Sequence, residues 1–256
     1  MLILLTNDDG IYAPGLEAME RELSRLGEVV VVAPATEQSG VGHSITFLTP
    51  LMAKEAFDGD RRRGWAVEGS PADCVKLAIA KFCPREPDLV VSGINGGLNV
   101  GINVLYSGTV AAATEGALYD IPSIAVSLEY SDHARFDRAA QISVGVIEQL
   151  LANDAFRDHK LYNLNMPTSA THRSANETQL RIVPMGVARW PAEFEERRDP
   201  QGRRYYWAAG TPPTEFPCET DLTAIYEGRV TLTPLTVDRT HTVKLPEMHK
   251  WNLTLE

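Results

Sequence analysis

The chain has 256 residues, of which 44% are hydrophobic and 23% are charged, a composition typical of a soluble globular protein. This length can bury a large core, so we expect one α/β domain or one domain with an appendage. The net charge of −10 argues against a general binder of nucleic acids or anionic membranes, because such proteins carry a basic face. A small anionic substrate is compatible with it, since metal ions and helix N-termini attract phosphate locally.

The cysteines and the apolar runs bound the location of the protein. Cys74, Cys83 and Cys218 are odd in number and include no C-x-x-C pair, so neither a disulfide framework nor a thiolate metal site is expected. The N-terminus enters a strand without a basic leader, which is unlike a signal peptide. No apolar run approaches the roughly 20 residues that span a bilayer. We expect a cytoplasmic protein.

The first strand is predicted at residues 2–5, four apolar residues typical of a strand buried on both faces. Pro14 fits the first turn of the following helix, which places Asp8 and Asp9 in the turn at the carboxyl end of the strand. Ligands bind at that edge of open α/β sheets. Two adjacent carboxylates repel each other, and a hard cation such as Mg²⁺ or Mn²⁺ would neutralise both. The alternative is an Asx-turn with a helix cap, which accounts for one aspartate more easily than for two.

The next elements complete a βαβ unit. A helical pattern over residues 16–26 precedes an apolar strand at 29–33, so the two strands are expected to be parallel. The polar segment 34–44 follows the carboxyl end of that strand. Ser39 could offer a hydroxyl oxygen to the same site, whereas His43 is expected to be a solvated loop residue.

A third buried strand is predicted at residues 89–91, and it leads into a loop at 92–109 that is rich in glycine and asparagine. Glycines let the backbone approach a ligand, and the amides of Asn95, Asn99 and Asn103 can bind a cation or an anion. A flexible loop is the alternative. Before it, residues 61–63 are expected to form a solvated arginine-rich tip, and Asp73 is expected to cap a helix at 70–82.

A helix begins where the glycine-rich loop ends. Ser107, Gly108 and Thr109 open it, and the N–H groups, hydroxyls and positive dipole end of such a helix form a good anion site. Ordinary helix capping is an equally good interpretation. The loop lacks the lysine of a Walker A motif, so nucleoside triphosphate binding of that type is not indicated.

Strands and helices continue to alternate up to about residue 170. Strands are predicted at 123–128 and 161–164 and a long helix at 136–151, a pattern typical of a layered α/β sandwich with a mostly parallel sheet. Strands at 180–183, 203–207 and 230–232 and a short helix at 220–226 follow. This hairpin-rich extension indicates either an oligomer contact or an extension of the sheet edge.

Taken together, six segments resemble the SurE family of survival proteins, metal-dependent phosphatases of nucleoside monophosphates. The resemblance covers most of the chain, from Met1 to about Thr240, and leaves residues 192–203 and the tail after 240 without a matching pattern. The segments, in order, are LILLTNDDGIYAPG, PATEQSGVGHS, SGINGGLNVG, YSGTVAAATEG, YNLNMP and TDLTAIYEGRVTLTPLTVDRT.

The resemblance implies a Rossmann-like three-layer α/β/α sandwich with one divalent metal ion per subunit, Mg²⁺ or Mn²⁺. The metal ligands would be Asp8, Asp9, Ser39 and Asn95. It also implies a homodimer or homotetramer in which the C-terminal part is exchanged between subunits. We therefore expect a catalytic core at 1–170 and an extension at 171–256 that belongs to the same domain.

The activity implied is hydrolysis of nucleoside 5′-monophosphates, with 3′-monophosphates and polyphosphate as further candidate substrates. Asp8 and Asp9 would be catalytic: either water attacks phosphorus and one aspartate accepts its proton, or an aspartate attacks directly and forms an acyl phosphate. Residues expected to bind the phosphate are Asn99, Ser107, Gly108 and Thr109. A small-molecule substrate is expected, and neither a nucleic acid polymer nor a membrane.

Two other functional classes use a similar site. Receiver domains carry an acidic pair after the first strand, but they transfer a phosphoryl group to a third aspartate, and here the corresponding strand end offers Asn95. The chain is also about twice the length of such a domain. A catalytically silent nucleotide-binding protein is the third possibility.

Overall fold

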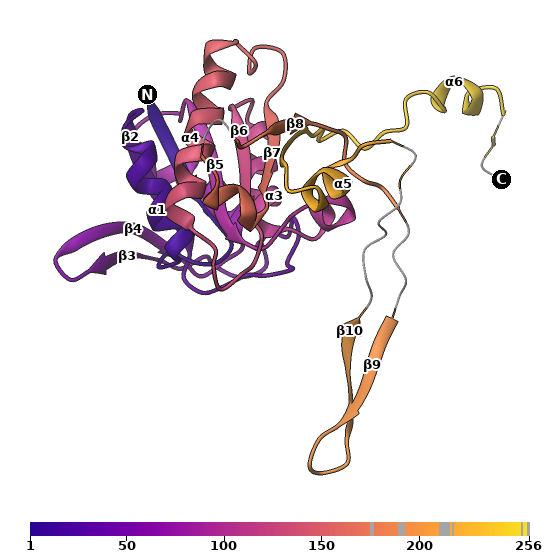
Figure 1. Ribbon diagram of the computed structural model, residues 1–256, viewed down its shortest axis with the longest axis horizontal. Helices are drawn as coiled ribbons and strands as arrows, with labels where there is room; N and C mark the ends of the chain where they lie inside the picture. The colour runs from indigo at the N-terminus through magenta and orange to yellow at the C-terminus, as the bar shows by residue number, and fades with distance from the viewer. Residues whose placement is uncertain (175–176, 189–192, 210–215, 217, 252, 255–256) are drawn as a thin grey trace.

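The central feature of the molecule is a mixed sheet whose nine strands, within the described residues, follow the order β3-β4-β2-β1-β5-β6-β7-β11-β8 (Figure 1). The computed structural model describes residues 1–174, 177–188, 193–209, 216, 218–251 and 253–254. The strands of this sheet are β1 (Leu2–Thr6), β2 (Glu28–Pro34), β3 (Ala53–Asp58), β4 (Arg61–Val67), β5 (Leu89–Gly96), β6 (Ser123–Leu128), β7 (Leu161–Met166), β8 (Leu180–Ile182) and β11 (Val230–Pro234). The α-helices are α1 (Pro14–Leu23), α2 (Pro71–Leu77), α3 (Gly108–Leu118), α4 (Phe136–Ala152), α5 (Asp221–Tyr226) and α6 (Leu245–Met248).

The middle of the sheet is parallel. β1 pairs in parallel with β2 and with β5, and β6 lies parallel between β5 and β7. All five residues of β1 are buried, as the apolar run predicts. Because the strands are parallel, their carboxyl ends meet at one edge, where Thr6 of β1 pairs with Ser92 of β5. The two loops that follow these strands therefore leave the sheet side by side.

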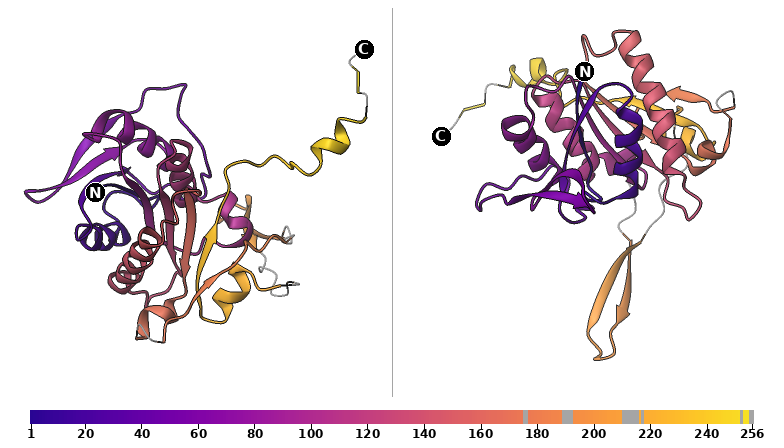
Figure 2. Two further views of the ribbon diagram at one scale, coloured as in Figure 1. Left: turned by 90° about the horizontal axis from the view of Figure 1, so that it is seen from above. Right: turned by 90° about the vertical axis from the view of Figure 1, so that its left-hand side faces the viewer.

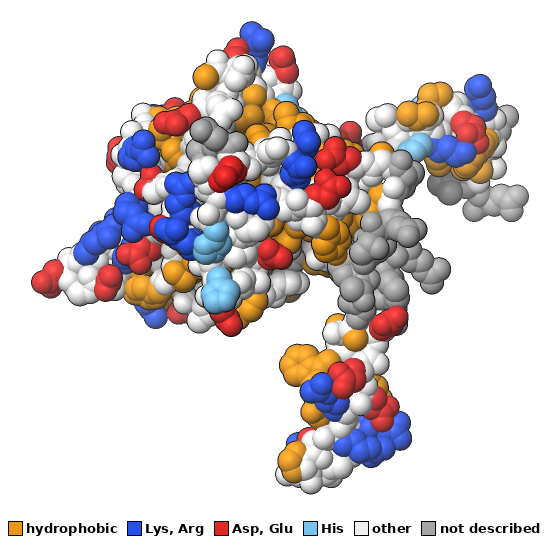
Figure 3. Space-filling view, in the orientation of Figure 1, with side chains coloured by type: hydrophobic (Ala, Val, Ile, Leu, Met, Phe, Trp, Pro, Cys, Tyr) orange, Lys and Arg blue, Asp and Glu red, His pale blue; other side chains and the backbone are white. Residues whose placement is uncertain are grey.

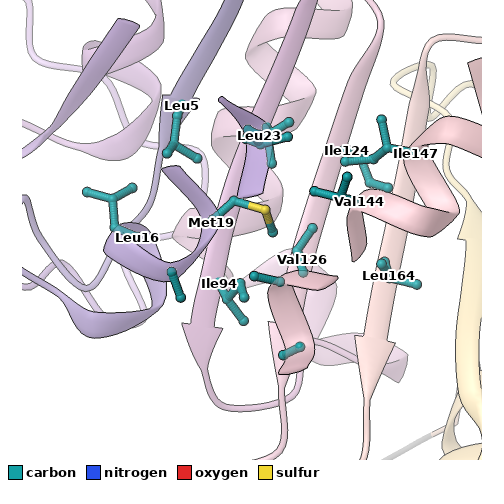
Figure 4. Close-up of a cluster of buried hydrophobic side chains, with 14 of the residues drawn as sticks. Leu5, Leu16, Met19, Leu23, Ile94, Ile124, Val126, Val144, Ile147 and Leu164 are labelled. Carbon is teal, nitrogen blue, oxygen red and sulfur yellow. The ribbon is translucent and has the colours of Figure 1, made fainter. Parts of the chain in front are cut away.

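Helices cover both faces of the sheet. α1 packs against α4 on one face, and α2 packs against α3 on the other (Figure 2). The side chains of β1 alternate between the two layers: Ile3 and Leu5 join the core with α1 and α4, and Leu4 joins the core with α2. Figure 4 shows Leu5 in the first of these cores, with Leu16 and Met19 of α1. The predicted three-layer α/β fold is confirmed.

The C-terminal part adds strands to this sheet. β11 lies antiparallel to β7, and β8 lies parallel to β11. Val230 and Leu232 of β11 are buried in the main core. Thr220 caps α5 through a reciprocal pair of hydrogen bonds with Thr223. Of the two alternatives for this region, the sheet-edge extension is therefore observed for residues 180–182 and 230–234.

The hairpin of β9 (Glu193–Arg198) and β10 (Arg204–Ala209) is built differently. Its antiparallel strands form a separate sheet, and every residue in them is exposed. Figure 3 shows hydrophobic and charged side chains interspersed on this hairpin, which stands away from the body. The short helix α6 is also exposed. The exchange of this extension between subunits and the boundary at residue 170 stay predictions.

Two local expectations can be compared with the structure. Asp73 caps α2 as predicted, since it forms a capping box with Ser70. The expectation of a solvated tip at residues 61–63 is wrong for Arg63. This residue is only 4% exposed, and its Nη1 lies 3.0 Å from Oε2 of Glu20 on α1. The β3–β4 hairpin folds back on α1, and sequence-local reasoning does not see that contact. No helix in the described part of the chain has the length and hydropathy needed to cross a bilayer.

Candidate metal and phosphate site

The turn after β1 is built by Asn7 rather than by either aspartate. Asn7 Nδ2 donates to the carbonyl of Gly10 at 2.9 Å, and Asn7 Oδ1 accepts from the Gly10 N–H at 3.2 Å. Gly10 has a φ of +104°, which L side chains rarely adopt. The N-cap position of α1 is Ala13. Neither the turn nor the helix cap therefore needs Asp8 or Asp9, and the alternative interpretation of the pair loses its support.

Asp8 lies against the start of α3. Its side chain is 5% exposed, and Oδ1 accepts a hydrogen bond from the hydroxyl of Thr109. A Cβ added to Gly108 would lie 2.9 Å from the Cβ of Asp8, so glycine permits this close approach. Burial, with a further contribution from the charge of Asp9, raises the pKa of Asp8 to about 6. A neighbouring cation would reverse this destabilisation of the carboxylate.

Asp9 points toward the loop after β5. Its Oδ2 accepts a hydrogen bond from the backbone N–H of Gly96 at 3.0 Å. Burial raises the pKa of Asp9, and the negative charge of Glu37 adds to the effect. Neither Asp8 nor Asp9 forms a salt bridge with any residue that the structure describes. In the described part of the chain, no ion pair therefore balances the charge of Asp8 or Asp9.

The loop that carries Ser39 is tied to the same turn. The N–H of Gln38 donates to the carbonyl of Asp8 at 2.8 Å. The hydroxyl of Ser39 donates to Oε1 of Glu37 at 2.6 Å. A hydroxyl that donates a hydrogen bond to a carboxylate still has oxygen lone pairs that can bind another partner. Glu37 is thus a residue of this site that the sequence analysis did not single out.

Asn95 lies at the end of β5, past an irregularity in the pairing of β5 with β6. Its Nδ2 donates to the carbonyl of Gly97 at 2.7 Å. This hydrogen bond fixes the amide and leaves Oδ1 as a candidate oxygen ligand. Asn95 and Asp9 are joined through the neighbouring Gly96, so the loops after β1 and β5 meet here.

The donor set fits a hard divalent cation. Two carboxylates, one hydroxyl and one amide oxygen are the ligand types that Mg²⁺ and Mn²⁺ prefer. Burial raises the pKa of both Asp8 and Asp9, and a bound cation would offset this cost of their negative charges. Within the described ranges no cluster of three or more His, Cys, Asp or Glu side chains is arranged as a metal site, so this candidate depends on Ser39 and Asn95.

At the start of α3 the Ser-Gly-Thr segment forms the helix cap, and its N-terminal end also adjoins the acidic pair. Ser107 is the N-cap, and its Oγ accepts from the N–H of Val110 at 3.1 Å. The same helix end faces Asp8 through Gly108 and Thr109. Its positive dipole end therefore adjoins the acidic pair. An anion that bridges the helix end and a cation at Asp8 would be bound by both.

Comparisons with known proteins identify the family of the chain. The family model described as "Survival protein SurE" matches residues 3–192. The chain belongs to the SurE family. A 5′-nucleotidase SurE from Rhodopirellula baltica is 57% identical over 99% of both chains. Another, from Desulforudis audaxviator, is 42% identical over 98% of this chain and 97% of its own length.

The fold is shared with a solved member of the SurE family. The crystal structure of a SurE protein from Aquifex aeolicus matches this chain with a TM-score of 0.82 and 35% sequence identity. The match covers 97% of this chain and 98% of that one. The resemblance drawn from the sequence motifs is thereby confirmed.

Asn99, another phosphate-binding candidate of this SurE chain, is also buried. It is 7% exposed, and its Nδ2 donates to Oγ of Ser127 at 2.8 Å. An amide nitrogen has a second N–H, which remains available for a ligand. The contact of Asn99 with phosphate stays a prediction, as do the roles of the metal ligands and of residues 107–109.

His43 is an exposed loop residue, as expected, but it also has a side-chain partner. Its Nε2 lies 2.7 Å from Oε2 of Glu115 on α3, and Lys76 donates to the other oxygen of that carboxylate at 2.9 Å. Glu115 is 4% exposed. Although burial raises the pKa of Glu115, the hydrogen bonds from His43 and Lys76 outweigh it and hold the pKa below its usual value. The loop of His43 is thereby anchored to the helix that begins at the candidate phosphate site.

Proposed function

We propose that this chain is a divalent-metal-dependent phosphatase that hydrolyses nucleoside 5′-monophosphates to nucleoside and phosphate. The observation that carries the proposal is the adjacent pair of buried Asp8 and half-buried Asp9, which has no salt-bridge partner among the described residues and adjoins the N-terminus of α3. The curated relatives that match the full chain are named 5′-nucleotidase. Asp8, Asp9, Ser39 and Asn95 would hold the metal ion, Mg²⁺ or Mn²⁺.

A bound divalent ion would neutralise charge on the phosphoryl group and make a water molecule more acidic. The protein would do the rest through positioning. Ser107 and the backbone N–H groups of Gly108 and Thr109 would hold phosphoryl oxygens, and Asn99 would add the second N–H of its amide. In this arrangement the phosphorus would lie between the helix end and the acidic pair, where in-line attack can occur.

In our preferred mechanism water is the nucleophile, and a carboxylate oxygen of Asp8 or Asp9 accepts its proton. A carboxylate committed to a metal ion is a poorer nucleophile, which disfavours direct attack and an acyl phosphate. A single-turnover reaction in ¹⁸O-water tests this choice. The label is expected only in the released phosphate, and label in a protein carboxylate would overturn the water mechanism.

The structure offers room for a nucleoside beside the phosphate site. A groove of about 1110 Å³ begins at Ser107, runs along α3 past Glu115 and is bounded by Leu235 of the C-terminal part. This volume is slightly above the usual range of small-molecule sites, about 300–1,000 Å³, and exceeds the need of phosphate alone. It supports a nucleoside monophosphate as the substrate class.

We also propose that the protein is a homodimer or homotetramer that uses its C-terminal part as a contact. The β9–β10 hairpin exposes large aromatic side chains, which are enriched in protein interfaces. They are Phe194, Tyr205, Tyr206 and Trp207. Light scattering tests the proposal: a Tyr206→Ser, Trp207→Ser double variant is expected to be a smaller species, and unchanged mass would count against a contact through the hairpin.

The activity test is phosphate release from a panel of 5′- and 3′-nucleoside monophosphates and polyphosphate. Each substrate is assayed with Mg²⁺ or Mn²⁺ and then with excess EDTA, and wild type is compared with Asp9→Asn. Turnover that requires metal and collapses in the variant supports the proposal and ranks the substrates. A folded protein that binds the ion and turns over no substrate would instead be a silent nucleotide-binding or regulatory protein.

A further inference from the structure

A buried clamp holds the backbone of Asn99 in place. The N–H of Asn99 donates to Oδ1 of Asn165 at 2.8 Å. Its carbonyl oxygen accepts from Nδ2 of Asn163 at 2.8 Å and from Nδ2 of Asn165 at 3.2 Å. Both asparagines lie on β7 and are at most 1% exposed. Two side chains of one strand thus bind both backbone polar groups of a single residue in the loop.

The side chain of Asn99 is held as well. Ser127 lies on β6 directly opposite Asn165 in the strand register, and its Oγ accepts from Nδ2 of Asn99 at 2.8 Å. Ser127 is fully buried. The backbone and the amide plane of Asn99 are therefore fixed by the carboxyl ends of two neighbouring strands. Within the described residues, the second N–H and Oδ1 of its amide have no hydrogen-bond partner, so they can bind a ligand.

A second clamp grips the loop two residues later. Asp221, fully buried at the start of α5, accepts from the N–H of Gly101 at 2.8 Å and from the N–H of Gly186 at 2.7 Å. Gly101 has a φ of +56°, and a Cβ there would lie 2.7 Å from Cδ1 of Leu222. Only glycine fits between the loop and α5, so the C-terminal part is packed directly on the loop that joins Asn95 to Ser107.

These polar groups are costly in the interior. Oδ1 of Asn163 is buried and has no hydrogen-bond partner among the described protein atoms. Asp221 is a buried carboxylate with hydrogen bonds from backbone N–H groups but no salt bridge in the described part of the chain. Burial of such groups is unfavourable unless they form hydrogen bonds, which an apolar side chain cannot form. In this fold, what they do is bind the polar backbone of the loop.

We propose that these four side chains are positioning residues, which fix the loop at residues 97–101 so that Asn99 and the start of α3 bind phosphate beside the acidic pair. The residues are Ser127, Asn163, Asn165 and Asp221. The inference rests on the proposed function for the identity of the anion. It gives a role to the YNLNMP and TDLTAIYEGR segments, which supply no metal ligand and no phosphate ligand.

The test compares Ser127→Ala and Asn165→Ala with wild type. Ser143→Ala is the matched control, because Ser143 is equally buried but bonds only to Ala139 within α4. The readouts are kcat and KM for a nucleoside monophosphate, the affinity for inorganic phosphate in the presence of Mg²⁺, and the affinity for Mg²⁺ alone. Calorimetry gives both affinities without turnover, and circular dichroism gives the folded fraction and Tm.

We expect phosphate affinity and kcat/KM to fall about 10- to 100-fold in both variants, because small misplacements of binding groups have effects of that size. Affinity for Mg²⁺ is expected to stay within about twofold of wild type, since the metal ligands are held by other contacts. The control is expected to behave as wild type. If Asn165→Ala does not fold, Ser127→Ala decides the matter, because it removes one hydroxyl and leaves the backbone clamp intact.

Asp221→Asn tests the second clamp through additivity. If both clamps act through the same loop, the loss in the Asn165→Ala, Asp221→Asn double variant is smaller than the product of the single losses. Losses that multiply would show that the two residues act independently and would overturn a shared role.

Other outcomes are equally informative. Unchanged phosphate affinity in folded variants, or Mg²⁺ affinity that falls as far as phosphate affinity, would overturn the positioning role and leave the proposed function standing. If wild type binds phosphate with Mg²⁺ but turns over no nucleotide, the proposed function fails, and phosphate affinity still judges the clamp. If wild type binds no phosphate at all, the clamp is not a phosphate-positioning device.

Discussion

Asp8 and Asp221 are both buried carboxylates with a pKa raised by burial, yet they are built for opposite purposes. The oxygens of Asp221 accept backbone N–H groups from Gly101, Gly186 and Leu222. Asp8 accepts a side-chain hydrogen bond from Thr109 at one oxygen and faces a second negative charge at Asp9. A carboxylate surrounded by N–H donors holds the architecture, whereas one with spare lone pairs beside another carboxylate is suited to a cation.

The largest expected effect is the loss of phosphatase activity when Asp8, the proposed metal ligand, is replaced. Asp8→Asn is expected to lower kcat/KM for a nucleoside monophosphate at least about a hundredfold, because the metal loses an anionic ligand. The measurement is phosphate release at saturating Mg²⁺, with calorimetry for Mg²⁺ affinity. Near-wild-type activity with unchanged Mg²⁺ affinity would remove Asp8 from the metal site.

Substitution of the two aspartates should change the free energy of unfolding in opposite directions. In the metal-free protein Asp8→Asn is expected to raise the free energy of unfolding by about 1–3 kcal/mol at neutral pH, because it removes a buried, repelled charge. Asp221→Asn is expected to lower it by about 1–3 kcal/mol, because an N–H donor then faces backbone N–H groups. Urea denaturation of both variants checks the pair, and a change of the same sign in both would break the comparison.

The pH dependence of stability should identify Asp8. Its pKa is about 6 in the folded protein, against 3.8 for an aspartate side chain in water, so the folded state binds the proton more tightly than the unfolded state does. Stability from this group is therefore greatest below about pH 4 and is lost as the pH rises toward and past 6. Thermal melts of metal-free wild type, from which those of Asp8→Asn are subtracted, should show that loss. Saturating Mg²⁺ should abolish it, and a flat difference curve would contradict the pKa shift.

The smallest expected effect concerns Glu37, which accepts the hydroxyl proton of Ser39. Glu37→Gln is expected to weaken Mg²⁺ binding roughly tenfold, because partners that orient a ligand have effects of about that size. Glu86→Gln is the charge-matched control, since Glu86 is exposed and precedes β5 at the opposite edge of the sheet. Calorimetry on the metal-free proteins measures both, and equal affinities for the two variants would assign Glu37 no part in the site.

Much of the fold was readable from the chain. Buried strands such as residues 2–5 and the capping of α2 by Asp73 depend on neighbours within a few residues, so local patterns predict them. The position of Asp8, Asp9 and Ser39 after strands was readable for the same reason. The burial of Arg63 and the partner of His43 were missed because Glu20 and Glu115 are distant in the sequence.

The sequence by itself determined the core strands and helices, the family and the residue types that follow each strand, but it did not determine β9 or the β3–β4 hairpin. Tertiary structure alone decided which of those residues meet, because β1 lies between β2 and β5, an order that the chain does not follow. It made Asn7 the residue that holds the turn, so neither aspartate is needed there. It also set Asn165 on Asn99 and Asp221 on Gly101, across 66 and 120 positions. Contacts over such separations depend on the packing of whole elements, which no local pattern encodes.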